Sequence, residues 1–144
     1  MVDFNKVLGD ALAGPSQPMN AADADLNDVV TQVSDAIRHQ VADADLRLTV
    51  LRKGADGILY ALSFITGAGG KQGPIVEGIL VSSIGYPIAI GQLLDLQNLT
   101  VLAPVGRIEL NDKNAVEAHF AELLSNANSP VFRRIAYLKN VRRE

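Results

Sequence analysis

The chain has 144 residues, of which 13 are Lys or Arg and 16 are Asp or Glu, so its formal net charge is -3 with neutral histidines. This length fits one domain and permits a core that needs neither disulfides nor metal. The absence of cysteine excludes disulfide frameworks, thiolate zinc sites and cysteine nucleophiles, and it agrees with a reducing compartment. We therefore expect a globular cytoplasmic protein.

Neither an export signal nor a membrane span is expected. Asp3, Lys6 and Asp10 interrupt the stretch in which an export signal needs about 7–15 apolar residues. The longest uncharged stretch, 78–94, is shorter than the roughly 20 apolar residues of a membrane helix, and Pro87 interrupts it.

The first eighteen residues are predicted to form a separable segment. Apolar residues recur there every three or four positions, which is typical of an amphipathic helix: Phe4, Val7, Leu8, Ala11 and Leu12. Gly14 and Pro15 end this helix, and the stretch from Pro15 to Pro18 predicts a rigid, extended connector. We therefore divide the chain into a helix with its connector, 1–18, and a single α+β domain, 19–144.

A longer apolar stripe predicts a second helix over about 22–42. The stripe consists of Leu26, Val30, Val33, Ile37 and Val41. Aspartates stand at its start, where the helix dipole favours anions. His39 falls near its C-terminal end, and we expect that side chain to cap the helix or to face solvent.

After Asp45 the apolar period changes to two, which predicts strands. Leu46, Leu48 and Val50 form the apolar side of the first strand. The turn 54–57 is rich in Gly and Asp, so the second strand, 58–66, is expected to return antiparallel to the first. Both faces of this second strand are apolar, and we expect the N-terminal helix or a second subunit to cover its second face.

Further strands are predicted over 75–84, 99–102 and 107–110, and Pro87 predicts a kinked edge strand over 85–91. A helix is expected to start at Asp112, and Ser129-Pro130 is typical of the start of a last helix. The predicted fold is α+β: an antiparallel β-meander of four to six strands, with N-terminal helices and two C-terminal helices packed on one face.

The Tyr86-Pro87 dipeptide follows a three-strand meander, with a helix before it and helices after it. In this element order and this dipeptide, the chain resembles the ubiquitin-conjugating-enzyme-like and RWD domains. The chain lacks the second proline of that family's pattern, and without cysteine it cannot carry the conjugating chemistry. The resemblance therefore implies an analogy of fold only.

The run Gly67–Gly73 is the most glycine-rich part of the chain, and it contains Lys71. It does not match a P-loop, because Ile65 stands where the pattern needs glycine and Gln72 where it needs Ser or Thr. It remains either a flexible connector or a loop that closes over a small anionic, nucleotide-like ligand. For the second case the predicted binding residues are Arg47, Arg52, Lys53, Gly69, Gly70, Lys71 and Tyr86. No cofactor is expected.

The inventory for catalysis and metal binding is sparse. His39 and His119 fall in separate predicted helices, and neither belongs to a ligand pair three or four residues apart. Ser82 and Ser83 lack the glycine-flanked turn of a serine hydrolase. We assign no catalytic or metal-binding residue. Five bases crowd the last dozen residues, but without an aromatic platform they predict complementation of a helix dipole rather than binding of nucleic acid.

The sequence favours a non-catalytic protein-binding or adaptor module that forms a homodimer or a higher homo-oligomer and has a protein partner. The apolar second sheet face and the N-terminal amphipathic helix support this interpretation. Two alternatives stay open. One is a receptor or sequestering protein for a small anionic ligand, and the other is a small enzyme that works through carboxylates, His119 or a hydroxyl group.

Overall fold

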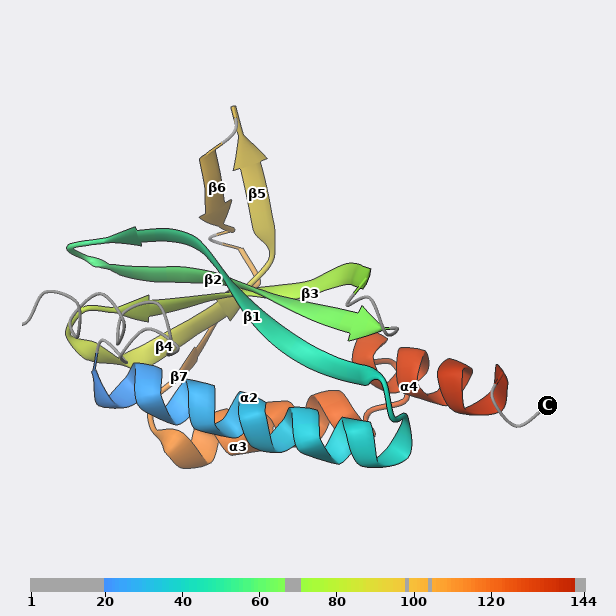
Figure 1. Ribbon diagram of the computed structural model, residues 1–144. Coiled ribbons are helices and arrows are strands. Elements are labelled where there is room, and N and C mark those ends of the chain that lie inside the picture. The colour runs from blue at the N-terminus through green and yellow to red at the C-terminus, as the bar shows by residue number, and fades with distance from the viewer. Residues whose placement is uncertain (1–19, 67–70, 98, 104, 142–144) are drawn as a thin grey trace, which may run out of the picture.

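The computed structural model describes residues 20–66, 71–97, 99–103 and 105–141 (Figure 1). Helix α2 (Ala21–Gln40) comes first, followed by strands β1 (Ala44–Gly54), β2 (Gly57–Thr66), β3 (Lys71–Ser82) and β4 (Gly85–Gly91). Then come β5 (Leu93–Leu96), β6 (Leu99–Leu102), β7 (Ile108–Leu110), α3 (Lys113–Ser125) and α4 (Pro130–Val141). The predicted α+β class is thereby confirmed. The predicted helix at 4–12 and its connector lie outside the described residues.

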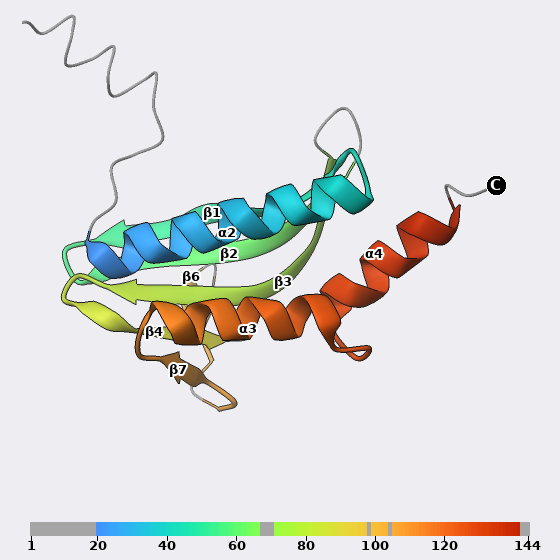
Figure 2. The same ribbon diagram turned by 90° about the horizontal axis from the view of Figure 1, so that it is seen from below.

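Five strands form one antiparallel sheet in the order β1-β2-β3-β4-β7, and β5 and β6 form a separate two-stranded hairpin. Figure 2 shows α2 and α3 side by side on one face of the sheet, with α2 in front of β1 and β2 and α3 in front of β3 and β4. The hairpin β5–β6 projects from the opposite face (Figure 1). The sheet therefore lies between a helical layer and a projecting hairpin.

Helix α2 begins with a cap that also binds the sheet. The Asn20 side chain accepts a hydrogen bond from the Asp23 N–H (3.0 Å) and donates one to the Ser82 carbonyl oxygen (2.8 Å). The residues that face the sheet are buried, among them Leu26 and Ile37. The predicted helix at about 22–42 is thus confirmed within two residues at each end.

Strand β2 is the centre of the core because both of its faces are buried. On the helical face its side chains pack with α2 and α3: Ile58, Tyr60, Leu62 and Phe64. On the other face Leu59, Ala61, Ser63 and Ile65 are at most 5% exposed. Part of the cover on this face comes from the hairpin β5–β6, which lies over Gly78, the residue on β3 that pairs with Ala61.

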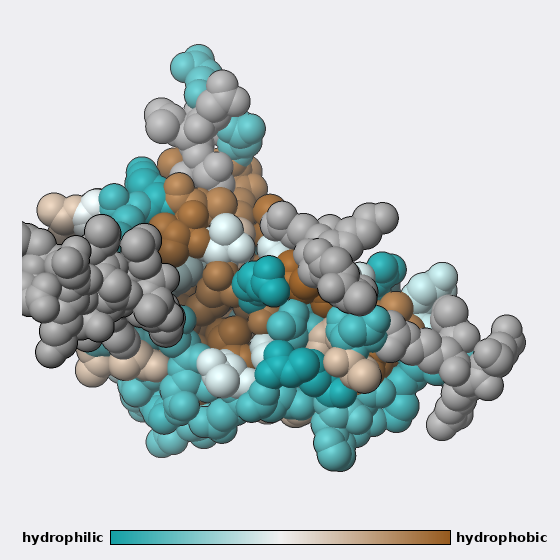
Figure 3. Space-filling model, viewed as in Figure 1, coloured by the Kyte–Doolittle hydropathy of each residue, from teal (hydrophilic) through white to brown (hydrophobic). Residues whose placement is uncertain are grey.

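The hairpin approaches the sheet closely because Gly78 has no side chain. A Cβ atom at this position would lie 2.5 Å from Leu93 Cδ2 and 2.8 Å from Leu102 Cδ1. The hairpin is closed at its base by a hydrogen bond from the Ala103 N–H to the Gln92 carbonyl oxygen (2.7 Å). Figure 3 shows hydrophobic side chains gathered around this base.

Strand β1 lies at the edge of the sheet, and α2 covers part of its open side. The Ser34 hydroxyl group donates a hydrogen bond to the Leu46 carbonyl oxygen (2.7 Å) and accepts one from the Leu46 N–H (3.2 Å). Farther along the strand, the pairing with β2 is shifted by a bulge between Val50 and Arg52.

The expectation of an edge strand over 85–91 is wrong. Strand β7 pairs with β4 from Ile88 to Ile90, so β4 lies between β3 and β7. Pro87 precedes this ladder, and its missing N–H group is therefore not needed for pairing with β7. The Tyr86-Pro87 peptide bond is cis.

The two C-terminal helices start at the predicted caps. Asp112 accepts a hydrogen bond from the Ala115 N–H (2.8 Å) at the start of α3, and Ser129 Oγ accepts one from the Val131 N–H (3.2 Å) at the start of α4. Val131 is buried, and Ile135 and Leu138 pack against the core. Beyond its first turn α4 extends past the end of the sheet (Figure 2).

Two tyrosine hydroxyl groups connect the sheet to the first turns of α2. Tyr60 on β2 donates to Asp23 Oδ1 (2.6 Å), and Tyr86 on β4 donates to Asp25 Oδ2 (2.5 Å). Burial, together with the hydrogen bond to Asp23, raises the pKa of Tyr60 to about 12. Burial and the bond to Asp25 also raise the pKa of Tyr86. The neutral phenols are thus part of the folded structure.

We expect the free energy of unfolding to fall as the pH rises from about 10 to about 12. An unfolded tyrosine ionises near pH 10, whereas Tyr60 keeps its proton in the folded state up to about pH 12. The stabilisation is therefore complete below pH 10 and is lost above it. Denaturant unfolding at a series of pH values should show a smaller fall for Tyr60→Phe than for the native chain. Equal falls would contradict the assignment, and Tyr137→Phe, at an exposed residue, is the control for loss of a phenol group.

We expect Gly78→Ala to destabilise the fold by about 1–3 kcal/mol, because the new methyl group overlaps Leu93 and Leu102 and displaces the hairpin. Gly91→Ala is the matched control. Gly91 pairs with Gly78 in the ladder, but its added Cβ would lie 3.5 Å from Leu102 Cγ, an ordinary contact distance. Thermal unfolding of both variants measures the difference. Equal stabilities of the two variants would contradict the close approach at Gly78.

Candidate functional site

A groove of about 450 Å³ lies between the C-terminal parts of α2 and α3 and one side of α4. Most of its lining is apolar: Ala36, Ile37, Leu124, Phe132, Ile135 and Ala136. Its polar lining residues are Gln40, Lys139 and Asn140. We call it the α2–α4 groove.

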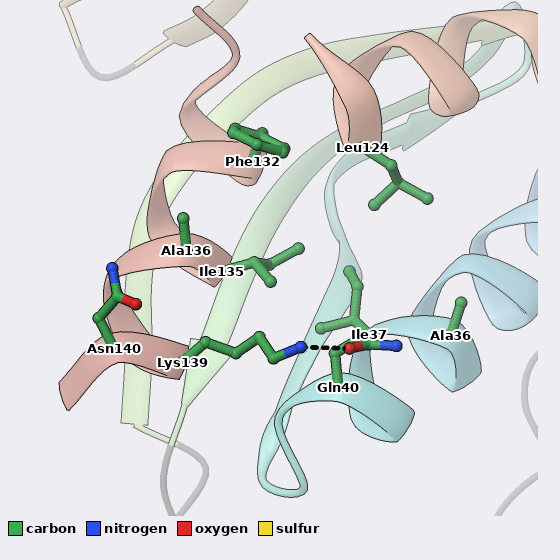
Figure 4. A pocket seen from close by; sticks show the side chains of 9 residues that line it. All are labelled: Ala36, Ile37, Gln40, Leu124, Phe132, Ile135, Ala136, Lys139 and Asn140. Carbon is green, nitrogen blue, oxygen red and sulfur yellow. Dashed lines mark hydrogen bonds between the residues drawn. The ribbon is translucent and has the colours of Figure 1, made fainter. Parts of the chain in front are cut away.

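The groove exists because α4 diverges from the body of the domain. A turn that contains Asn126 and Ser129 separates α3 from α4: the Ser129 N–H donates to the Asn126 carbonyl oxygen (2.9 Å), and Ser129 Oγ donates to that of Leu123 (2.6 Å). In Figure 4, Ile135 points from α4 toward Ile37 of α2. The space between the two helices is therefore lined by side chains from both.

One hydrogen bond connects α2 and α4 at the C-terminal ends of both helices. Lys139 Nζ donates to Gln40 Oε1 (2.7 Å), as Figure 4 shows. Lys139 is the one titratable group among the lining residues, so the groove offers no acid and base pair. Apolar walls with a few polar groups at one end are suited to binding apolar side chains.

The structure separates the residues predicted to bind an anionic ligand. Arg52 on β1 is in register with Leu59, whereas Lys71 on β3 is in register with Thr66. These two partners are seven residues apart on β2, which is about 23 Å at the usual rise of a strand. Arg47 and Lys53 are exposed, and Gly69 and Gly70 lie outside the described residues.

The remaining member of the predicted ligand set, Tyr86, is half-buried, and its hydroxyl group is bound to Asp25 of α2. Lys71 is therefore not brought together with Arg52, and Tyr86 contributes to helix packing. The anion-binding role of these residues stays a prediction.

His119 on α3 forms a pair with Glu77 on β3. The distance from Nε2 to Oε1 is 2.7 Å, and both side chains are 13% exposed. His119 lines two neighbouring cavities of about 270 and 330 Å³. The enzyme alternative of the sequence analysis named His119, whereas Glu77 was not recognised. Glu77 could have been recognised because it stands two residues before Ile79, so that this carboxylate falls on the apolar side of the predicted strand 75–84.

The basic residues of α4 have partners close by. Arg133 Nε donates to the Ala127 carbonyl oxygen (3.2 Å), and the Arg134 guanidinium lies 5.6 Å from the centre of the Tyr137 ring. Lys139 is bound to Gln40. Of the described bases in the last dozen residues, only Lys139 lies in the last turn of α4, so the interpretation as complementation of the helix dipole is wrong for Arg133 and Arg134, which lie in the first half of the helix. The expectation that the chain does not bind nucleic acid stays a prediction.

No family model, curated protein or solved structure matches the chain. The resemblance to the ubiquitin-conjugating-enzyme-like and RWD domains therefore stays a prediction of fold analogy. Among the residues that the structure describes, no three His, Cys, Asp or Glu side chains are grouped so that they could hold a metal ion. None of the described helices has the length and apolar character needed to span a membrane.

We expect His119→Ala to destabilise the fold by about 1–3 kcal/mol, because it leaves the Glu77 carboxylate, which is only 13% exposed, without this hydrogen bond. His39→Ala is the matched control, because His39 is exposed near the end of α2. Its effect should stay within about 0.5 kcal/mol. Denaturant unfolding at pH 7 checks both values, and equal stabilities of the two variants would contradict the role of the pair.

Proposed function

We propose that the chain is a non-catalytic protein-binding module that associates with itself, and that the α2–α4 groove is its binding surface. The observation that carries this proposal is the composition of the groove, in which six of the nine lining residues are apolar. The cytoplasmic location is part of the proposal and rests on the absence of cysteine.

The shape of the groove favours a helix as the bound element. Its walls are helices, and an amphipathic helix binds such a surface through side chains at positions i, i+3 or i+4 and i+7. Ile37 at its floor is 2% exposed and belongs to the core, so the groove is continuous with the interior of the domain. A helix bound there would extend the hydrophobic core across α2 and α4.

The hydrogen bond between Lys139 and Gln40 supports the same function. It fixes the distance between the ends of α2 and α4 and places polar groups at one end of an apolar surface. A polar rim around an apolar centre is the usual arrangement of a protein interface.

A second candidate function is catalysis at the pair of His119 and Glu77. A histidine that is oriented by a carboxylate and lies beside two cavities fits general-base chemistry. In a screen of small substrates, an activity that is lost in His119→Ala and kept in His39→Ala would favour this candidate over the binding module.

Site-specific crosslinking tests the binding function. A photoreactive amino acid at Ala36, an exposed residue that lines the groove, should give crosslinked protein products in cells. The same amino acid at Ala118, an exposed alanine of α3 that is not among the lining residues, is the matched control. We expect much more product at Ala36 than at Ala118, because only a residue that lines the groove lies within reach of a bound partner. Equal yields at the two positions, or none at Ala36, would overturn the proposal.

A further inference from the structure

The apolar stripe of residues 4–12 matches the α2–α4 groove in length. From Phe4 to Leu12 a helix rises about 12 Å, and the α4 wall of the groove, from Phe132 to Lys139, rises about 10 Å. The stripe has the i, i+3, i+4, i+7 spacing that a helix needs in order to face a groove along its whole length.

The charges of the two surfaces are also complementary. Asp3 and Asp10 are seven residues apart, so in a helix they lie two turns apart on the same flank beside the apolar stripe. The groove has one ionisable lining residue, Lys139, and it stands at one end. A helix whose stripe enters the groove can place an aspartate near this lysine.

The connector limits how residues 4–12 can reach the groove of their own chain. Along α2, the groove begins at Ala36, about 24 Å from Asn20. Eight residues lead from Leu12 to Asn20, and a chain that contains Pro15 and Pro18 spans about 25 Å over that length in the polyproline II conformation. The connector would have to be straight merely to touch the near end of the groove. A helix from another copy has no such limit.

We propose that the α2–α4 groove of each copy takes the apolar stripe of residues 4–12 from a second copy, so that two chains exchange their N-terminal helices. This inference rests on the proposed function, because it names the partner of the same groove. Reciprocal exchange gives a closed two-fold dimer in which each groove is filled once. The helix, which is too short to be stable alone in water, then gains its order from the partner's groove.

The test uses the full-length chain and two pairs of variants. Leu8→Glu places a charge in the apolar stripe, and Lys6→Glu, on the opposite side of the same predicted helix, is its control. Ala36→Glu places the same charge in the groove at an exposed position, and Ala118→Glu is its control. Because Ala36 and Ala118 are both exposed, neither change disturbs the core, and circular dichroism verifies the fold of every variant.

Sedimentation velocity measures the association of each variant against the 15.3 kDa mass of one chain. We expect the native chain and both controls to be dimers. Leu8→Glu and Ala36→Glu should each raise the dissociation constant at least about tenfold, as expected when a charge prevents burial of one large apolar side chain.

Mixing the two weakened variants distinguishes exchange from docking within one chain. The Leu8→Glu chain keeps a native groove, and the Ala36→Glu chain keeps a native helix. In an equimolar mixture the native helix of one chain should therefore fill the native groove of the other, so the mixture should form a heterodimer although each variant alone does not dimerise. A mixture that stays monomeric, or a native chain that is a monomer, would overturn the exchange.

The same measurements separate this inference from the proposed function. Dissociation by Ala36→Glu without dissociation by Leu8→Glu would overturn the exchange and leave the groove as an interface for another element. A dimer that survives both substitutions would overturn the exchange, and loss of the crosslinking difference between Ala36 and Ala118 would overturn the groove as well.

Discussion

The burial of β2 on both faces is the constraint on which the rest of the structure depends. A strand whose side chains are mostly apolar on both faces needs a layer on each side, because exposing either row would cost about 25 cal/mol for each square ångström of apolar surface. On one side α2 and α3 supply this layer. On the other side the hairpin β5–β6 supplies part of it, and its approach depends on the absence of a side chain at Gly78. The two faces of one strand thus determine where the helices and the hairpin lie.

Helix α2 is used on two sides at once. Its buried stripe packs on the sheet, while Ala36 and Gln40, near its C-terminal end, line the groove beside α4. At its other end, Asn20, Asp23 and Asp25 bind backbone and tyrosine groups of the sheet. Because α2 is fixed at the end that carries no groove, its groove-lining residues can contact a partner without loss of the contacts that hold the helix in place.

Most of the order of the elements could be predicted from periodicity, because the change from a period near 3.6 to a period of two after Asp45 marks a boundary that the fold keeps. Strand β5 (Leu93–Leu96) was not predicted, because four residues are too short to show a period. The caps at Asp112 and Ser129 were predictable for the same local reason. The position of β4 was not, since its pairing with β7 joins residues about twenty positions apart. The apolar residues Ile37 and Ile135 were recognisable, but the groove between them depends on the direction in which α4 leaves the sheet, which no local pattern specifies.

The hydrogen bonds between Ser34 and Leu46 bear on how such a domain avoids the wrong kind of association. An edge strand with open backbone groups is a template for sheet-to-sheet aggregation. The Ser34 hydroxyl group is hydrogen-bonded to both the N–H group and the carbonyl oxygen of Leu46, as a neighbouring strand would be. Farther along β1, the bulge near Arg52 interrupts the regular edge. Only the few residues between Leu46 and the bulge keep the regular spacing of open backbone groups with which a strand of another molecule could pair. Replacement of Ser34 by alanine would lengthen that stretch toward the start of β1 and make the folded protein more prone to form fibrils.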